Sequence, residues 1–269
     1  MKFFVLGSNG MLGAYMSKYF STKYQVENIN RDKIDASSPF AGHDYGLLNF
    51  LPIEKDDVVI NCIGMIKPQV DKYGTEAALR VNSLFPRVLS NACKLRNAQL
   101  IHITTDCVFS GNKGPYHEES PHDANDVYGK TKSLGEPENC MVIRTSIVGE
   151  EKTNKRSLVE WVKSNAGKKV NGYINHLWNG VTCLQLAKTI EDIMVRDVSW
   201  LGVRHVFTPQ NMTKYYLLDQ INQKYNLNMS VIPVTADVAC DRTMNSVYEP
   251  RTEIPSIEQQ IKEMKEFTL

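Results

Sequence analysis

Short apolar runs alternate with longer segments of helical periodicity along the first half of the chain. The apolar runs have the length of buried strands. We expect strands at 3–6, 26–29, 58–60, 100–103 and 141–143. The clearest helical pattern between them runs from Glu76 to Lys94. Strands and helices in this order predict an α/β fold, with a doubly wound parallel sheet covered by helices on both faces.

The pattern changes after Val148, where residues 149–156 are polar and unpatterned. No long Gly/Ser linker or low-complexity segment marks a boundary, so we infer one from this change. The sequence predicts a core at 1–148 and a smaller C-terminal lobe at 149–269, with a segment at about 181–210 returning to the core. Within the lobe we expect a strand near 203–207 and helices at 158–164, 184–195, 214–225 and 257–267.

Composition excludes several classes of protein. With 269 residues, 42% of them hydrophobic and 23% charged, the chain can bury a full core, which argues against disorder. A net charge of +1 gives no overall attraction to nucleic acid or to an anionic membrane, so we expect neither as a partner. No run approaches the ~20 apolar residues of a membrane span, and the N-terminus lacks the shape of a signal peptide, so we expect a cytoplasmic protein. The six cysteines have no metal-type spacing and do not by themselves indicate disulfides.

A glycine-rich turn lies between the first predicted strand and the first predicted helix. Glycines at this spacing allow a tight turn and let the backbone approach a pyrophosphate, while the helix N-terminus supplies amide donors. The strand–turn–helix context favours a Rossmann-type dinucleotide site over a plain turn. The residues expected to contact the cofactor here are Gly7, Asn9, Gly10, Met11, Leu12 and Gly13.

The end of the second predicted strand indicates which dinucleotide binds. An NAD-preferring enzyme places an acid there for the ribose hydroxyls, whereas this chain has Asn30 followed by Arg31. An uncharged residue and an arginine suit a 2′-phosphate. We therefore expect NADPH as the cofactor, with Arg31 near its phosphate, the alternative being a merely solvated arginine.

A tyrosine and a lysine one helical turn apart form a candidate catalytic pair, Tyr128 and Lys132. The lysine ammonium, with the positive nicotinamide of the oxidised cofactor, is expected to lower the phenol pKa from about 10, so that it exchanges protons with a substrate oxygen. Lys132 is also expected to orient the cofactor ribose. The same spacing recurs at Tyr19 and Lys23, so spacing alone proves little. Tyr128 differs because it follows a strand that ends at Thr105, and the strand ends of a parallel sheet form the ligand crevice.

The order of these motifs resembles the extended short-chain dehydrogenase/reductases, and within them the dTDP-4-dehydrorhamnose reductases. The resemblance is specific to about residue 148 and then fades. It implies a triad of Thr105, Tyr128 and Lys132 and a nucleotide-linked 4-keto-6-deoxy sugar as substrate. It further implies that Asn82 supports the active-site helix, the alternative being an ordinary polar helix residue. The matching segments are 7–13, 59–62, 80–82, 102–111, 114–116 and 127–136.

One position departs from the rhamnose-type reductases, which usually carry tyrosine where this chain has Cys107. Thr-x-Cys is similar to GDP-fucose synthases and to the epimerase-reductases of UDP-rhamnose formation, where the thiol moves a proton beside the ketone. A C4 ketone acidifies the hydrogens on C3 and C5, so the pocket formed by Thr105 and Tyr128 would serve epimerisation as well as hydride transfer. The alternative is that Cys107 is a small buried residue. Inverting the carbon also requires an acid that returns a proton from the opposite face of the sugar. The sequence does not decide which residue this is, and the candidates are His176, Lys163 and Lys155.

These observations together predict a dinucleotide-binding core, a substrate-binding lobe and an NADPH-dependent 4-reductase that first epimerises C3 or C5. Arg242 is a candidate for the sugar nucleotide's phosphates, since arginine matches them bidentately, unless it is simply an exposed arginine. Two alternatives remain: a plain 4-reductase, and an NADP-binding regulatory subunit similar to the one that regulates a methionine adenosyltransferase. The sequence leaves open the nucleotide, any 2-acetamido group, the epimerised carbon and the oligomeric state, for which a homodimer is one option.

Overall fold

The computed structural model describes residues 1–38, 44–153 and 155–269. Internal contacts divide the chain into two compact units. Unit 1 comprises Met1–Phe109, Pro121–Arg144 and Ser199–Arg204, and unit 2 comprises Ser110–Ser120, Thr145–Val198 and His205–Leu269. The functional division at residue 148 into cofactor and substrate parts stays a prediction, and Asn154 of the polar segment beyond it lies outside the described residues.

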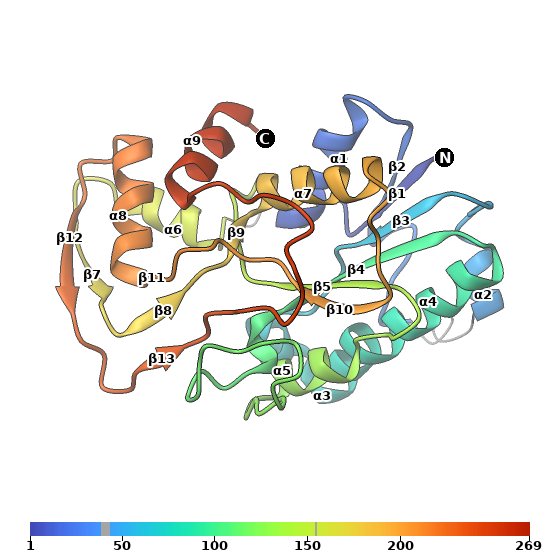
Figure 1. The fold of residues 1–269 in the computed structure, drawn as a ribbon, viewed down its shortest axis with the longest axis horizontal. Helices are drawn as coiled ribbons and strands as arrows, with labels where there is room; N and C mark the ends of the chain where they lie inside the picture. The colour runs from blue at the N-terminus through green and yellow to red at the C-terminus, as the bar shows by residue number, and fades with distance from the viewer. Residues whose placement is uncertain (39–43, 154) are drawn as a thin grey trace. The chain divides into compact units, whose positions relative to one another are not determined.

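Unit 1 is built around a six-stranded sheet with the order β10-β5-β4-β3-β1-β2 (Figure 1). Its strands are β1 Phe3–Leu6, β2 Val26–Ile29, β3 Val58–Asn61, β4 Gln99–Thr105, β5 Met141–Thr145 and β10 Gly202–His205. β1 pairs in parallel with β2 and β3, and β3 pairs in parallel with β4. The predicted doubly wound α/β fold is confirmed. The strand order reverses between β1 and β3, the point at which such sheets bind ligands beyond the carboxyl ends of their strands.

Helices cover the two faces of this sheet (Figure 1). They are α1 Met11–Ser21, α2 Asp44–Leu48, α3 Lys67–Leu79, α4 Phe85–Leu95 and α5 Val127–Leu134, with a 3₁₀ turn at Asp106–Val108. The alternation of side chains along β1 assigns the faces. The Phe3 ring stacks on Phe20 of α1 at 4.7 Å, whereas Phe4 joins the buried cluster that contains Phe85 and Leu89 of α4.

The helical pattern expected from Glu76 to Lys94 is helical throughout, within a longer stretch from Lys67 to Leu95 that is not one regular helix. Helix α3 begins at Lys67, is kinked at Gly74, where φ is 84°, and is followed by a π-helical turn at Arg80–Leu84. Pro86 lies just after this turn and has no N–H to bond the carbonyl four residues earlier, which removes one α-helical hydrogen bond there. Apolar periodicity continues through such a turn, so the sequence pattern did not reveal it.

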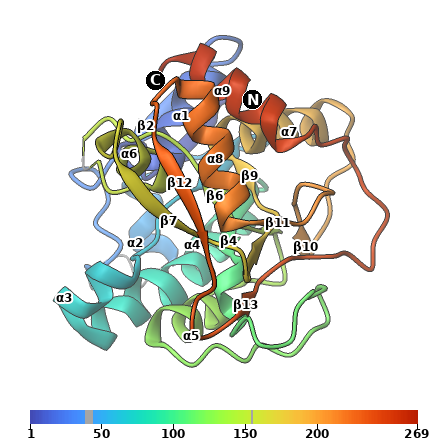
Figure 2. The same ribbon diagram turned by 90° about the vertical axis from the view of Figure 1, so that its left-hand side faces the viewer.

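Unit 2 contains three small sheets, ordered β11-β8-β13, β12-β7 and β6-β9. Figure 2 shows β12 running beside β7, and the two strands pair in parallel. The predicted helices of this half are confirmed to within one residue. They are α6 Leu158–Ser164, α7 Cys183–Val195, α8 Lys214–Tyr225 and α9 Ile257–Phe267, and the small strands are β6 Ile147–Val148, β7 Lys169–Tyr173, β8 His176–Trp178, β9 Val181–Thr182, β11 Met212–Thr213, β12 Ser230–Val234 and β13 Cys240–Asp241. Among the described residues, no helix has the length and apolar character needed to cross a membrane.

Candidate functional site

The glycine turn lies at the carboxyl end of β1. Gly7 has φ of 75°, a conformation that favours glycine, and its carbonyl accepts the N–H of Gly10 at 2.9 Å. A Cβ on Gly13 would lie 2.1 Å from the Gly7 oxygen, so the first turn of α1 approaches the loop more closely than any side chain permits. The turn therefore directs the N-terminus of α1 toward the carboxyl edge of the sheet.

A cavity of about 390 Å³ opens within unit 1 beside this turn. Its size lies in the range of small-molecule sites. Of the residues predicted to bind the cofactor, Gly7, Asn9, Gly10 and Arg31 line the cavity, whereas Met11, Leu12 and Gly13 form the first turn of α1 and are not part of its wall. Lys132 of α5 is not part of the wall either. The remaining lining residues come from the segments after β2 and β3, from α3 and from the π-helical turn: Asn30, Ile34, Asp35, Ala36, Ser37, Cys62, Ile63, Gly64, Met65, Gln69, Tyr73, Ala77 and Val81.

Arg31 forms an ion pair with Asp35, which also lines the cavity. Its Nε and Nη2 both donate to Oδ2 of Asp35, at 3.2 and 3.1 Å. Burial raises the pKa of Asp35, but hydrogen bonds from Ser37 and the charge of Arg31 outweigh this and hold the pKa below its usual range. Asp35 did not emerge from the sequence analysis, although its spacing of four residues from Arg31 is a signal that could have indicated the pair.

Thr105, Cys107 and Tyr128 come together where β4 ends. Thr105 Oγ1 accepts the N–H of Cys107 at 3.1 Å and donates to Asp106 Oδ1 at 3.1 Å. The Tyr128 phenol is hydrogen-bonded to the Thr105 side chain and lies close enough to Cys107 for ionisation of the thiol to raise the pKa of the phenol. A Cβ on Gly129 would lie 2.3 Å from the Cys107 carbonyl oxygen, so α5 packs directly against this turn. The thiol and the phenol are thus neighbours in unit 1.

The pKa of Tyr128 is raised in the structure, whereas the lowering expected from Lys132 together with an oxidised nicotinamide stays a prediction. Burial raises it above its ordinary value, and nearby negative charge from Cys107, Asp106 and Asp126 raises it further, while the hydrogen bond to Thr105 lowers it. The phenol is therefore protonated at neutral pH, as an ordinary tyrosine also is, and its raised pKa makes it a weaker acid.

Lys132 lies one turn along α5 from Tyr128 and is only 4% exposed. Its Nζ donates to the carbonyl of Ile103 on β4 at 3.2 Å. Burial lowers the pKa of Lys132 to about 8, although the charge of Glu136 raises it. By contrast, the pair with the same spacing, Tyr19 of α1 and Lys23 just beyond its end, forms an exposed 3.4 Å contact.

Asn82, in the π-helical turn, connects α5 to the segment after β3. Its amide donates to the Met65 carbonyl at 3.0 Å and to Thr131 Oγ1 at 3.1 Å, while its oxygen accepts the Met65 N–H at 2.8 Å. Ser83 adds a 2.7 Å bond to the Thr131 carbonyl. These bonds fix the turn of α5 that lies between Tyr128 and Lys132.

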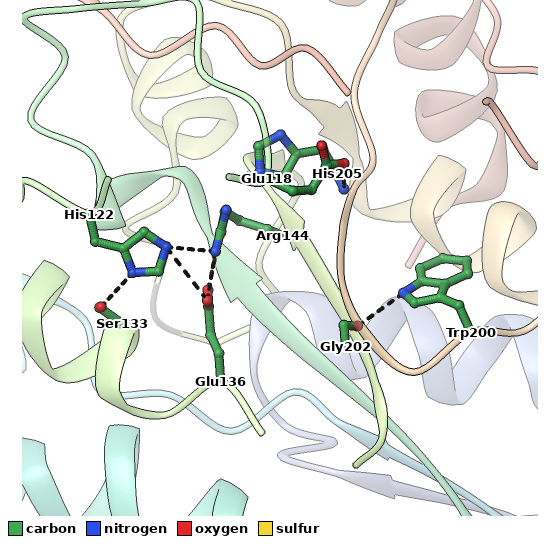
Figure 3. Close-up of polar contacts among 8 residues, drawn as sticks. All are labelled: Glu118, His122, Ser133, Glu136, Arg144, Trp200, Gly202 and His205. Atoms are coloured by element: carbon green, nitrogen blue, oxygen red, sulfur yellow. Dashed lines mark hydrogen bonds and ion pairs between the residues drawn. The ribbon is translucent and has the colours of Figure 1, made fainter. Parts of the chain in front are cut away.

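A buried ion pair joins the end of α5 to β5 and was not predicted from the sequence (Figure 3). Arg144 is 1% exposed and donates from Nε and Nη2 to the two Glu136 oxygens, at 3.1 and 2.7 Å. Its Nη2 also lies 2.7 Å from His122 Nε2, and His122 Nδ1 lies 2.6 Å from Ser133 Oγ. Because arginine can only donate, His122 Nε2 accepts, and Nδ1 carries the proton.

The remaining predicted residues lie in unit 2. Arg242 donates from Nη2 to the Ser110 carbonyl at 3.0 Å. Of the candidate acids, His176 Nε2 lies 3.0 Å from the Val238 carbonyl, Lys163 forms ion pairs with two glutamates, and Lys155 is exposed. The roles of these residues stay predictions. In the part of the chain that the structure describes, no three His, Cys, Asp or Glu side chains gather as metal ligands would.

Comparisons with known proteins agree with this architecture. A family model described as the RmlD substrate binding domain matches residues 1–251. The chain is 31% identical over 156 residues to a dTDP-4-dehydrorhamnose reductase of Streptomyces griseus, covering 54% of this chain and 49% of the relative. It is 28% identical over 209 residues to methionine adenosyltransferase 2 subunit beta of Danio rerio, covering 71% of this chain and 64% of the relative.

The chain thus spans about half to two thirds of the length of these two relatives. Among solved structures, the dTDP-4-dehydrorhamnose reductase of Bacillus anthracis in complex with NADP superimposes with a TM-score of 0.81 at 18% identity. That comparison covers 100% of this chain and 99% of the other. At this level of identity the likeness establishes the fold.

Proposed function

The chain belongs to the RmlD substrate binding domain family, and from this premise we propose that it reduces the C4 ketone of a nucleotide-diphosphate 4-keto-6-deoxy sugar with NADPH. The observation that carries the proposal is the gathering of Thr105, Tyr128 and Cys107 where β4 ends, in the unit that also holds the glycine-turn cavity. Similarity to the Streptomyces griseus reductase supports the substrate class.

The residues around the glycine turn fit a dinucleotide. Gly13 brings the start of α1 against the Gly7 carbonyl, and backbone amides at a helix N-terminus bind pyrophosphate. Arg31 supplies the cation of the cavity wall for a 2′-phosphate. When bound, NADPH supplies the hydride. The predicted cofactor core would then lie in unit 1, and Arg242 would act on the substrate's phosphates from the predicted substrate lobe.

Tyr128 is proposed as the acid that protonates the C4 oxygen. The phenol is protonated at neutral pH, and its hydrogen bond to the Thr105 side chain positions it where β4 ends. Lys132, with a pKa of about 8, is mostly charged at pH 7 and is proposed to orient the cofactor ribose. Oriented donors of this kind stabilise the negative charge that develops on a ketone oxygen.

Cys107 is proposed to remove a proton from the carbon beside the ketone before reduction. Its position beside Tyr128 supports this role, because one group would then act on the carbon while the other binds the oxygen. An acid from the opposite face would return the proton. If Cys107 only fills space, the protein is a plain 4-reductase, a reading that the relatives support equally well.

The test of the reductase is NADPH oxidation with a panel of 4-keto-6-deoxy sugar nucleotides generated in situ by 4,6-dehydratases. We expect Tyr128→Phe to lower kcat by at least about 100-fold, the usual contribution of a positioned proton donor. Tyr19→Phe is the matched control, because it removes a tyrosine hydroxyl from the other Tyr-x-x-x-Lys pair and should leave kcat unchanged. Equal activity of the two variants would refute the proposed acid.

The test of the epimerase is the same reaction in deuterated water with mass detection of the product. Deuterium at a ring carbon beside C4 that disappears in Cys107→Ser would support the epimerase and identify the carbon. Reduction without this label would mean that Cys107 is only a packing residue and that the protein is a plain 4-reductase.

A second candidate, a regulatory subunit that binds NADP, is favoured by the similarity to methionine adenosyltransferase 2 subunit beta. In that case the purified chain would bind NADPH but reduce none of the sugar nucleotides. It would also bind a catalytic methionine adenosyltransferase subunit and change its turnover. Reduction of any sugar in the panel, together with failure to bind that subunit, would exclude this candidate.

A further inference from the structure

Resting on the proposed use of NADPH, we propose that Asp35 is a specificity-determining residue that weakens the preference of this chain for NADPH over NADH. It does so by holding the guanidinium of Arg31 and by adding negative charge to the wall that faces a 2′-phosphate. The residue lies four positions after Arg31, in the segment that follows β2.

The contacts of Arg31 show that its donors are directed at a protein carboxylate. Nε and Nη2, on the same edge of the guanidinium, both donate to Asp35 Oδ2, at 3.2 and 3.1 Å. Arginine binds phosphate through parallel N–H donors of this kind. A 2′-phosphate that used this edge would have to displace Asp35, whereas one bound by the other donors would approach with the carboxylate still in place.

Asp35 itself is held in position. Its Oδ1 accepts the backbone N–H of Ser37 at 2.9 Å and the Ser37 hydroxyl at 2.6 Å. The carboxylate therefore keeps hydrogen bonds to Ser37 even when Arg31 is drawn toward a ligand. A rotation that removed its charge from the cavity wall would break these two bonds.

The charge of the cavity wall follows from these residues. Of the described side chains that line the cavity, only Arg31 and Asp35 carry charge at neutral pH, so their formal charges cancel. A phosphate monoester carries about −1.5 to −2 at pH 7, and a wall of zero net charge gives it little attraction. A ribose hydroxyl, in contrast, can donate to a carboxylate, which is how NAD-preferring sites bind NADH. Asp35 thus weakens the binding of NADPH without weakening the binding of NADH.

The experiment is titration of the purified chain with NADPH and with NADH, followed by fluorescence of the reduced nicotinamide, with no sugar present. We expect Asp35→Asn to tighten NADPH binding about tenfold, equivalent to about 1.4 kcal/mol, and to leave NADH binding the same or weaker. Arg31→Met should weaken NADPH binding and leave NADH binding nearly unchanged.

The matched control is Asp32→Asn. Asp32 lies in the same segment and accepts a 3.3 Å hydrogen bond from Asn30, but it does not line the cavity, so its removal should change the NADPH-to-NADH ratio less than twofold. Ser37→Ala is a second test that keeps the charge and the backbone N–H bond but removes the hydroxyl bond to the carboxylate, and it should shift the ratio toward NADPH by less than Asp35→Asn does.

The outcomes separate this inference from the proposed function. An unchanged ratio of dissociation constants in Asp35→Asn, or weaker NADPH binding, would overturn the inference while leaving the reductase intact, because Asp35 would then only orient Arg31. Failure of the wild-type chain to bind either dinucleotide would overturn the proposed cofactor and the inference with it.

Discussion

Replacing Arg144 with methionine would measure what the buried ion pair contributes to the stability of unit 1. The Glu136 side chain is only 6% exposed, so removing the guanidinium leaves a carboxylate without its partner and largely without water. Loss of one member of a buried pair costs about 3–5 kcal/mol. The guanidinium also lies over the Phe109 ring at 5.1 Å, a contact worth up to about 2 kcal/mol when shielded from water. We therefore expect Arg144→Met to lower the free energy of unfolding by at least about 3 kcal/mol.

Urea-induced unfolding followed by circular dichroism measures this change. The matched control is Arg80→Met, which breaks an exposed pair with Glu76 at 2.9 Å and should cost at most about 0.5 kcal/mol. A double variant, Arg144→Met with Glu136→Leu, removes both charges and should recover most of the loss, because an apolar pair of similar volume often replaces a buried ion pair without cost. A loss in Arg144→Met no larger than that in Arg80→Met would refute the reasoning.

Two further predictions concern the elements that form the site. Gly13→Ala, whose Cβ would lie 2.1 Å from the Gly7 oxygen, should weaken NADPH binding more than tenfold in a fluorescence titration, whereas Gly10→Ala, at 3.3 Å from the same oxygen, should have a smaller effect. Asn82→Ala removes three buried hydrogen bonds, including the one to Thr131, and should cost about 1–3 kcal/mol in urea unfolding and lower kcat more than it raises KM, because α5 loses its support.

Strands β1, β3 and β5 could be predicted because they are short runs buried on both faces. The run from Phe3 to Leu6 is wholly buried, and so is β3. The small sheets of unit 2 gave no such signal, because several of their strands are two or three residues long and the alternating pattern needs more. β12 and β7 pair across 60 positions of sequence, from Lys169 to Ser230, and no local pattern encodes such a pairing.

The candidate site also has a part that could be predicted from the sequence and a part that could not. Thr105, Tyr128 and Lys132 could be found because their types and spacing carry the chemistry, and α5 does bring the last two one turn apart. Their electrostatic environment could not be found from spacing. The raised pKa of Tyr128 depends on burial and on the carboxylates and the thiol around it, which adjoin it only in the folded chain.

The protonation of His122 gives unit 1 a predictable dependence on pH. Burial lowers the pKa of His122, and the charge of Arg144 lowers it further, while Glu136 and Asp123 raise it by less. In the unfolded chain this histidine takes up a proton near pH 6.5, whereas in the folded chain it stays neutral until a lower pH. The free energy of unfolding therefore falls as the pH drops below about 6.5, by at most about 1.4 kcal/mol per pH unit for one group. Buried His102 has a lowered pKa as well and contributes in the same direction, so the comparison must be between variants. We expect His122→Gln to reduce, but not abolish, the loss of urea stability between pH 7.5 and 5.5. An identical loss in the variant and the wild-type chain would mean that His122 already accepts its proton in the folded state, which its hydrogen bond from Arg144 forbids.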